Sequence, residues 1–450
     1  MLTTEEILHL VNDRKYAEVK KEIIERNEAD IADLLEDIRE EDQRIRVFRL
    51  LPKDVAADVF SHLPIELEQS IITSLTDRET KNIIDNMFAD DATDLMEEMP
   101  ANVVKRILAN ASAETRRDIN HLLKYEEDSA GSIMTVEFVD LKRNMTVKQA
   151  IARIREVGID KETINTCYVL DLDRKIVGTV TLRTLLLSNP DAVVAEIMDE
   201  YVISVMTTDD QETVAHQFQK YDFLAMPVVD SENRLVGIIT VDDIVDILQE
   251  EATEDIEKMA AILPSEKPYL RTGIWETYKS RIPWLLFLMI SATFTGMILS
   301  SYESALAVVP ALTAFIPMLM DTGGNAGSQA SVSVIRALSL KDVEFKDIGR
   351  VIIKEALVAV SIGVTLSIAN LIRLIIMYGY SEQQMLVTMT VCVTLAIVVV
   401  IAKIIGCTLP IIANQLGFDP AVMASPLITT LVDAVSLSIY FAIAANVFNF

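Results

Sequence analysis

Histidine and cysteine are scarce in this chain. Its 450 residues include 4 His and 3 Cys, and the cysteines (Cys167, Cys392 and Cys407) lie far apart without a CxxC pair. Zinc sites and disulfide frameworks need clusters of these residues, so we expect neither. Scattered cysteines also indicate a reducing compartment. The sequence shows no nucleophile–base set and no phosphate loop, so we do not expect an enzyme.

Basic residues are under-represented in one part of the chain only. The formal net charge is -27, from 67 acidic and 40 basic residues. Residues 271–450 hold ten of each, so residues 1–270 carry the whole excess, with 57 acidic against 30 basic side chains. Such an acidic surface repels nucleic acid and anionic lipid and attracts cations. We therefore expect divalent cations, and no nucleic acid, as partners of residues 1–270.

Polar residues are sparse in five long apolar runs, which lie near 282–300, 305–338 (broken in the middle), 350–378, 385–413 and 421–448. A bilayer is crossed by roughly 20 apolar residues, so each run predicts a membrane span. Lys and Arg precede the first run and separate the second from the third, which places the N-terminal half in the cytoplasm and the C-terminus outside. The polar N-terminus has no secretory signal, which agrees. We expect a multi-pass protein of the cytoplasmic (inner) membrane, in contact with its lipid.

The last run contains an acidic residue at membrane depth. Asp433 lies about ten residues inside it, where a carboxylate costs about 2.5–3.5 kcal/mol, so we expect it to face a wet or protein-lined cavity. Thr429 adds an oxygen one turn earlier, and Pro420 and Pro426 favour free carbonyls. This hard-oxygen environment suits Mg²⁺ or Ca²⁺. The structural alternative is an ion pair of Asp433 with Lys403 or Arg373.

The second run contains the polar sequence PMLMDTGGNAGSQ. We expect its glycines to interrupt the helix, because Gly323, Gly324 and Gly327 disfavour helical backbone. Asn325 then supplies a polar side chain at membrane depth, where irregular backbone must line a cavity or be buried in protein. The alternative is tight helix packing through small residues. Together with Asp433, the pattern favours a pore.

Two internal repeats organise residues 1–253. IMTVEFVDLKRNMTVKQAIARI is echoed by IMDEYVISVMTTDDQETVAHQF, and CYVLDLDRKIVGTVTLRTLL by MPVVDSENRLVGIITVDDIVDIL. Each copy predicts strand, helix, strand, turn, strand and helix, with Gly178 and Gly237 at matching turns. The pair resembles tandem CBS domains, regulatory modules that often bind adenosine nucleotides, so ATP is a candidate ligand. Before it, residues 54–64 recur as 90–100 and predict a superhelix of stacked helices.

Acidic residues crowd in three short groups. These are Asp90, Asp91, Asp94, Glu97 and Glu98; Asp242, Asp243 and Asp246; and Glu250, Glu251, Glu254 and Asp255. A charge run is by default a solvated face. Like charges four residues apart nevertheless destabilise a helix by a few tenths of a kcal/mol per pair. Since we see no basic partners nearby, we interpret the groups as sites that a divalent cation neutralises.

The complete pattern resembles the MgtE family of magnesium transporters. The matching motifs are GGNAGSQ, PLITTLVD and TVDDIVDILQEEATEDIEKM. The resemblance covers essentially the whole chain and implies a multidomain membrane protein. Its predicted parts are an acidic all-α superhelical N-domain (1–130), α/β tandem CBS domains (131–253), a connecting, plug-like helix with its linker (254–280) and a five-helix α transmembrane pore domain (281–450).

The resemblance also implies a mechanism. A homodimer forms a Mg²⁺ pore with Asp433 as its main ion site, and cytosolic Mg²⁺ closes this pore by bridging the N-domain, the CBS domains and the connecting helix. The predicted metal residues are Asp433, Thr429 and Asn325 in the pore, and Asp58, Asp90, Asp91, Asp94, Asp222, Asp242, Asp243, Asp246, Glu251, Glu254, Asp255 and Asp419 outside it. Asp419 is expected to meet the connecting helix.

Two other functions remain open. A coupled secondary divalent-cation transporter or exporter has the same motifs, and proton or sodium dependence of transport would favour it. A CBS-type membrane sensor without transport leaves Asp433 and GGNAGSQ without a purpose.

Overall fold

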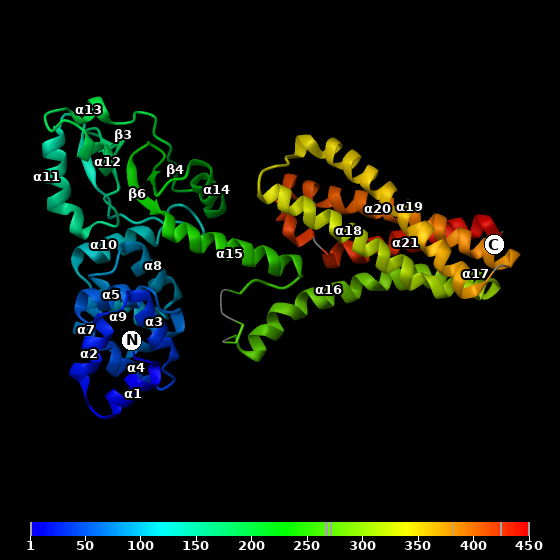
Figure 1. The fold of residues 1–450 in the computed structure, drawn as a ribbon, viewed down its shortest axis with the longest axis horizontal. Helices are drawn as coiled ribbons and strands as arrows, with labels where there is room; N and C mark the ends of the chain where they lie inside the picture. Colours follow the sequence, from blue (N-terminus) through cyan, green and yellow to red (C-terminus); the bar gives the residue numbers. More distant parts are fainter. Residues whose placement is uncertain (1, 266–268, 271, 380, 424, 449–450) are drawn as a thin grey trace. The chain divides into compact units, whose positions relative to one another are not determined.

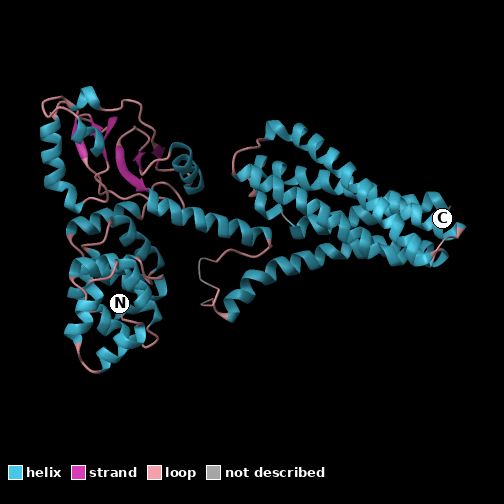
Figure 2. Ribbon diagram, viewed as in Figure 1, coloured by secondary structure: helices cyan, strands magenta, loops and turns pink. Residues whose placement is uncertain are grey.

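The computed structural model describes residues 2–265, 269–270, 272–379, 381–423 and 425–448 (Figure 1). They divide into two compact units, an N-terminal unit, Met1–Leu248, and a C-terminal unit, Gln249–Phe450. In the described residues the β-strands lie between Asp140 and Thr240, and the remaining regular structure is helical (Figure 2).

The N-terminal unit begins with a stack of short helices, as predicted. They are α1 (Thr4–Asn12), α2 (Tyr16–Ile24), α3 (Glu28–Asp37), α4 (Glu41–Phe48), α5 (Lys53–Ser61), α6 (Ile65–Ser74), α7 (Asp77–Ile84), α8 (Ala89–Glu98), α9 (Ala101–Asn110) and α10 (Ala113–Leu122). The predicted repeat corresponds to two equivalent pairs, α5–α6 and α8–α9. Pro64 and Pro100 cap the second helix of each pair, a position that tolerates the missing N–H.

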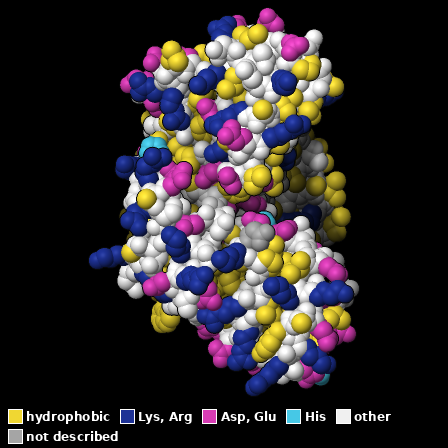
Figure 3. Space-filling view, turned by 90° about the vertical axis from the view of Figure 1, so that its left-hand side faces the viewer, with side chains coloured by type: hydrophobic (Ala, Val, Ile, Leu, Met, Phe, Trp, Pro, Cys, Tyr) yellow, Lys and Arg dark blue, Asp and Glu magenta, His cyan; other side chains and the backbone are white. Residues whose placement is uncertain are grey.

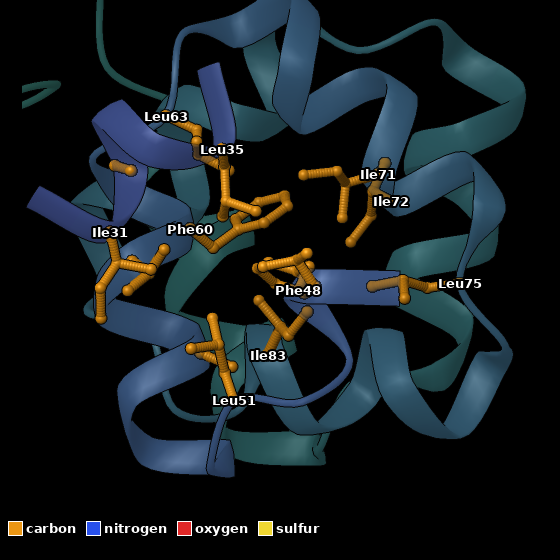
Figure 4. Close-up of a cluster of buried hydrophobic side chains, with 14 of the residues drawn as sticks. Ile31, Leu35, Phe48, Leu51, Phe60, Leu63, Ile71, Ile72, Leu75 and Ile83 are labelled. Atoms are coloured by element: carbon orange, nitrogen blue, oxygen red, sulfur yellow. The ribbon is translucent and has the colours of Figure 1, made fainter. Parts of the chain in front are cut away.

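A continuous apolar core holds this helical stack together. Figure 4 shows side chains from successive helices converging on Phe48 and Phe60. The two rings meet edge to face, with centroids 6.0 Å apart. Since each helix is at most ten residues long, its stability comes from burying this face against its neighbours.

The CBS repeat forms two three-stranded sheets with the same topology. The strands are β1 (Asp140–Lys142), β2 (Thr166–Leu170) and β3 (Ile176–Thr181), then β4 (Val205–Met206), β5 (Ala225–Val229) and β6 (Leu235–Thr240). In each sheet the first strand runs parallel, and the third antiparallel, to the middle strand. The helices between them are α11 (Val147–Val157), η1 (Gly158–Asp160), α12 (Leu182–Leu187), α13 (Val194–Ile197) and α14 (Gln211–Tyr221).

The predicted placement of Gly178 and Gly237 at turns is wrong. Both lie inside strands, β3 and β6. A Cβ added at Gly237 would lie 2.7 Å from the carbonyl oxygen of Thr135, and one at Gly178 would lie 3.1 Å from that of Asp199, so glycine favours close packing at both positions.

The C-terminal unit contains the apolar helices. Its main helices are α16 (Ile274–Ser301), α18 (Ile316–Ser339), α19 (Ile348–Tyr378), α20 (Glu382–Gln415) and α21 (Ser425–Phe448). Short segments accompany them: α17 (Glu303–Val308), η2 (Pro310–Phe315), η3 (Phe345–Asp347) and η4 (Pro420–Met423). One further helix, α15 (Val241–Met259), begins in the N-terminal unit and ends in this one.

Four described segments are long and apolar enough to span a membrane: Ile274–Ser301, Phe345–Tyr378, Gln384–Gln415 and Pro420–Phe448. The fifth predicted span corresponds to α18, which has 24 residues. Its polar residues, among them Asp321, Asn325 and Gln329, lower its hydropathy. It packs against α20 and α21, so the five helices form one bundle.

The predicted interruption at the glycines of the second span is also wrong. α18 is continuous through Gly323, Gly324 and Gly327. A Cβ at Gly324 would lie 2.9 Å from Thr429, and one at Gly406 of α20 would lie 2.1 Å from the carbonyl oxygen of Gly327. These glycines therefore permit close helix packing, which was the alternative explanation.

Candidate cation sites

Helix α8 places acidic side chains beside the CBS pair. Its apolar residues Ala92, Leu95 and Met96 are buried in the helical core. Asp90 is buried with them, and its carboxylate accepts a hydrogen bond from the backbone N–H of Asp91 at 3.0 Å. Asp91, half-buried, lies close enough to Asp243 of α15 for the two carboxylates to repel each other.

Asp90, Asp91, Asp242, Asp243 and Glu162 form what we call the acidic cluster. Burial, together with the charge of Asp243, raises the pKa of Asp91 to about 6 and that of Glu162 to about 8. Burial also raises the pKa of Asp243 to about 6, although the 2.7 Å hydrogen bond that Thr240 donates to its carboxylate lowers this pKa. Burial raises the pKa of Asp90 well above its usual range. Among the described residues, no Lys or Arg forms an ion pair with the cluster.

Sequence reasoning missed two acids at this site, Glu162 and Glu68. Glu68 of α6 is only 7% exposed. Burial, together with the charges of Asp91 and Asp94, raises its pKa to about 8. Neither acid belongs to a charge run. Glu68 does carry a sequence signal, because it occupies the same helical face as Ile71, Ile72 and Leu75 and thus a core position.

The other predicted acids of the N-terminal unit fall into two classes. Asp58, Asp94 and Asp246 interact electrostatically with Asp91, Glu68 and Asp243, respectively. Asp222 is exposed and ends α14 in a left-handed conformation, with φ of 54°. In the described part of the chain, no hydrogen bond or ion pair joins Asp222 to the acidic cluster.

A cavity of about 1640 Å³ lies between the helical stack and the CBS pair. Asp58, Glu137, Arg153, Lys161 and Arg174 are among its lining residues. Over the face drawn in Figure 3, Lys and Arg side chains are interspersed with Asp and Glu. This face of the described residues therefore has no continuous acidic patch, and the acids without basic neighbours are those of the acidic cluster.

In the C-terminal unit, Asp433 lies half-buried on α21. The carboxylate of Asp321, on the neighbouring helix α18, acts on it electrostatically. Thr429 contacts α18 at Gly324, whereas Asn325 is exposed. The structural alternative is not observed, because Lys403 pairs with Glu355 at 3.1 Å and Arg373 donates to the sulfur of Met318 at 3.3 Å.

The expectation that the acids on α15 lack basic neighbours is wrong for Glu254. Lys258 Nζ lies 2.6 Å from Glu254 Oε1 and 2.7 Å from Asp419 Oδ2. Asp419 does contact the end of α15, and the ammonium group of Lys258 makes this contact. Glu251 and Asp255 also lie on α15, both half-buried.

No group of three or more His, Cys, Asp and Glu side chains is arranged to hold a metal ion directly within the described residues. Mg²⁺ dehydrates reluctantly and usually keeps several waters, with one or two carboxylates as protein ligands. The chemistry available at Asp91–Asp243 and at Asp321–Asp433 is therefore outer-shell attraction of a hydrated ion.

Family models match three parts of the chain. They are described as the CBS domain (residues 130–189 and 194–250), the MgtE intracellular N domain (26–128) and MgtE, divalent cation transporter (316–443). Together with the apolar bundle, these matches define a multi-pass membrane transporter of divalent cations.

Two relatives named magnesium transporter MgtE match almost end to end. The one from Thermus thermophilus is 36% identical over 98% of this chain and 97% of its own length. The one from Bacillus subtilis is 34% identical over 97% of this chain and 96% of its own. The chain belongs to the MgtE family of magnesium transporters.

Solved structures match the N-terminal part. The soluble part of a magnesium transporter superposes with a TM-score of 0.53 at 31% identity, covering 55% of this chain and 98% of that one. The cytosolic domain of the Mg²⁺ channel MgtE in complex with ATP gives 0.52 at 34%, covering 54% and 99%. These matches confirm the fold predicted for the helical stack and the CBS pair.

Proposed function

We propose that this chain is a Mg²⁺-selective channel that imports Mg²⁺ across the cytoplasmic membrane, with Asp433 as its main ion site. The observation that supports this most is the approach of Asp321 and Asp433 from two packed helices of an apolar bundle. A carboxylate at membrane depth is costly, so such residues face a cavity or the bundle interior and mark ion pathways. Two carboxylates attract a hydrated divalent cation without stripping its water. Flow is then downhill, driven by the membrane potential.

We propose further that cytosolic Mg²⁺ closes the pore by binding at the acidic cluster. The cluster joins α8 of the helical stack to α15 and to Glu162 of the CBS pair, so an ion there links these parts. Without the ion the carboxylates repel each other, and the contact between the two domains loosens. With the ion the contact tightens, and α15 carries the change toward the C-terminal unit.

The pore is tested by flux into proteoliposomes containing the purified protein. Asp433→Asn removes the charge at constant size and should reduce Mg²⁺ flux at least tenfold, roughly the effect of 1.4 kcal/mol. Asp342→Asn makes the same change at an exposed loop residue and should leave flux unchanged. Undiminished flux in Asp433→Asn would contradict the assignment.

The same preparation separates channel from coupled transport. Flux of Mg²⁺, Mn²⁺, Co²⁺ and Ca²⁺ is compared at equal gradients, and selectivity for Mg²⁺ is expected. A flux that requires a proton or sodium gradient would instead establish a secondary transporter or exporter. If the correctly folded protein carried no flux of any ion, the result would favour the membrane sensor without transport.

We also propose a homodimer, with the N-terminal unit in the cytoplasm and the C-terminus outside. A carboxylate pair in one copy gives an incomplete lining, and a second copy would complete a pathway. Because the ATP complex of the related cytosolic domain has the same fold, we propose ATP as a ligand of the CBS pair. Light scattering of the purified protein tests the dimer, and a rise in its melting temperature with ATP tests the nucleotide.

A further inference from the structure

Within the C-terminal unit, Lys258 joins the last turn of α15 to Asp419, just before the turn η4. Lys258 Nζ contacts Glu254 Oε1 one turn earlier and Asp419 Oδ2 across the contact, at 2.6 and 2.7 Å. The Lys258 side chain is 24% exposed. Burial lowers the pKa of Lys258, but hydrogen bonds to Asp419 and Glu254 outweigh it, so the net pKa is raised. The ammonium is thus charged and shared by two carboxylates.

Asp419 connects this lysine to the base of α21. Its second oxygen, Oδ1, accepts a hydrogen bond from the backbone N–H of Ala421 at 2.7 Å and so fixes the turn η4. Beside this polar contact, Met259 packs against Ala421 and against Ile335 of α18. One acid therefore holds both the end of α15 and the turn that leads into the helix carrying Asp433.

The chain that follows Lys258 is also fixed by hydrogen bonds. The N–H groups of Ile262 and Ala261 donate to the carbonyls of Glu257 and Lys258, both at 2.9 Å, with Ala261 in the left-handed region at φ of 56°. This pattern is a Schellman cap, which ends the helix at a defined residue. Next, the N–H of Leu263 donates to the carbonyl of Ser280 on α16 at 2.9 Å.

We propose that Lys258 is a positioning residue that holds α15 on Asp419 in place of a divalent cation. A divalent ion at Glu254 and Asp419 would have to displace the ammonium group of Lys258, which already neutralises both carboxylates. The contact is then permanent, and Mg²⁺ acts on the other end of α15. The role in gating rests on the proposed function, whereas the contact itself does not.

Hydrogen exchange of the purified full-length protein tests the contact directly, at the amides of Ile262 and Leu263. In wild type, exchange should be the same in EDTA and in Mg²⁺. In Lys258→Met it should be roughly fivefold faster in both, the factor for losing one partly buried ion pair. Lys258→Arg keeps the charge and should behave as wild type. Exchange in Asp419→Asn should be as fast as in Lys258→Met, and the double variant should exchange no faster than either single variant.

A result in which wild-type exchange is fast in EDTA and slow only in Mg²⁺ would overturn the proposal, because a divalent ion would then hold the contact. Flux supplies the second readout. The Mg²⁺ concentration that halves flux should rise severalfold in Lys258→Met and not in Lys258→Arg; an unchanged concentration in Lys258→Met would overturn the positioning role. If wild-type flux does not respond to cytosolic Mg²⁺, the proposed gate fails, and hydrogen exchange still decides whether Lys258 holds the contact.

Discussion

In the described residues, some carboxylates of the C-terminal unit are neutralised by a base, whereas those of the acidic cluster in the N-terminal unit are not. In the C-terminal unit, Glu355 and Lys403 pair at 3.1 Å with exposures of 14% and 6%, and Asp419 is held by Lys258. In the N-terminal unit, the acidic cluster has no such base among the described residues. Neutralised acids hold helices at fixed positions, whereas unneutralised ones leave a repulsion that an external cation can remove. The difference predicts rigidity at the two neutralised contacts and Mg²⁺ dependence at the acidic cluster. Asp321 and Asp433 are the exception in the C-terminal unit, because the two carboxylates act on each other electrostatically.

The largest effect is expected from a steric change in the C-terminal unit. In Gly406→Ala the new methyl would lie 2.1 Å from the carbonyl oxygen of Gly327, so α18 and α20 must move apart. Overpacking of this kind costs about 1–3 kcal/mol or more. Thermal unfolding of the purified protein should show the loss with and without Mg²⁺. The matched control is Gly296→Ala, because nothing lies within 4 Å of a Cβ there.

The next effect concerns the acidic cluster. Asp91→Asn together with Asp243→Asn removes two carboxylates whose pKa values are raised to about 6. We expect the Mg²⁺-free protein to be more stable than wild type at pH 8, because the folded state no longer holds two mutually repelling carboxylates, and Mg²⁺ to add little further stability. Chemical unfolding followed by circular dichroism measures both. Asp30→Asn, at an exposed residue, should change neither; a double variant that Mg²⁺ stabilises as much as wild type would show that the ion binds elsewhere.

The pH dependence follows from the same groups. Their pKa values in the folded state are raised from near 4 to about 6 for Asp91 and Asp243 and about 8 for Glu68 and Glu162. The folded state therefore binds more protons than the unfolded state, and stability falls as pH rises from about 4 to about 8. Melting temperatures without Mg²⁺ should decrease over this range. Mg²⁺ should reverse the decrease at about pH 8 and have little effect near pH 5, where protons already neutralise the cluster; equal Mg²⁺ effects at both pH values would contradict this.

The smallest effect is expected at Glu68, one buried acid beside the cluster. Glu68→Gln removes its charge at nearly constant volume. Because Glu68 is 7% exposed, the variant should be more stable than wild type at pH 8, and this gain should shrink toward pH 5. Unfolding at the two pH values measures this difference. Equal stabilisation at both would indicate a packing effect instead of a charge effect.

Much of the fold was predictable because its signals are local and repeated. The helical stack and the two CBS sheets follow from periodicity and from internal repeats, and both are confirmed. The glycine predictions failed for a physical reason: a glycine permits either a turn or a close approach of two chains, and the sequence alone does not distinguish them. Gly178, Gly237 and Gly324 all proved to serve close approach.

Contacts between distant residues were the other limit. Asp433 was predicted as an ion site from sequence because an acid in an apolar run is conspicuous, and this role stays a prediction. The contact of Lys258 with Asp419 joins residues far apart in the chain, and Glu162 lies outside every acidic run. The partners of both become visible only when the fold brings their segments together.

Gating by Mg²⁺ requires that the acidic cluster sense the same ion that passes Asp433. The most direct measurement is flux into proteoliposomes while Mg²⁺ is raised on the side of the N-terminal unit, for wild type and for Asp91→Asn with Asp243→Asn. Wild-type flux should fall as this Mg²⁺ rises, and flux of the double variant should stay high. A double variant that closes at the same Mg²⁺ concentration as wild type would contradict the central claim.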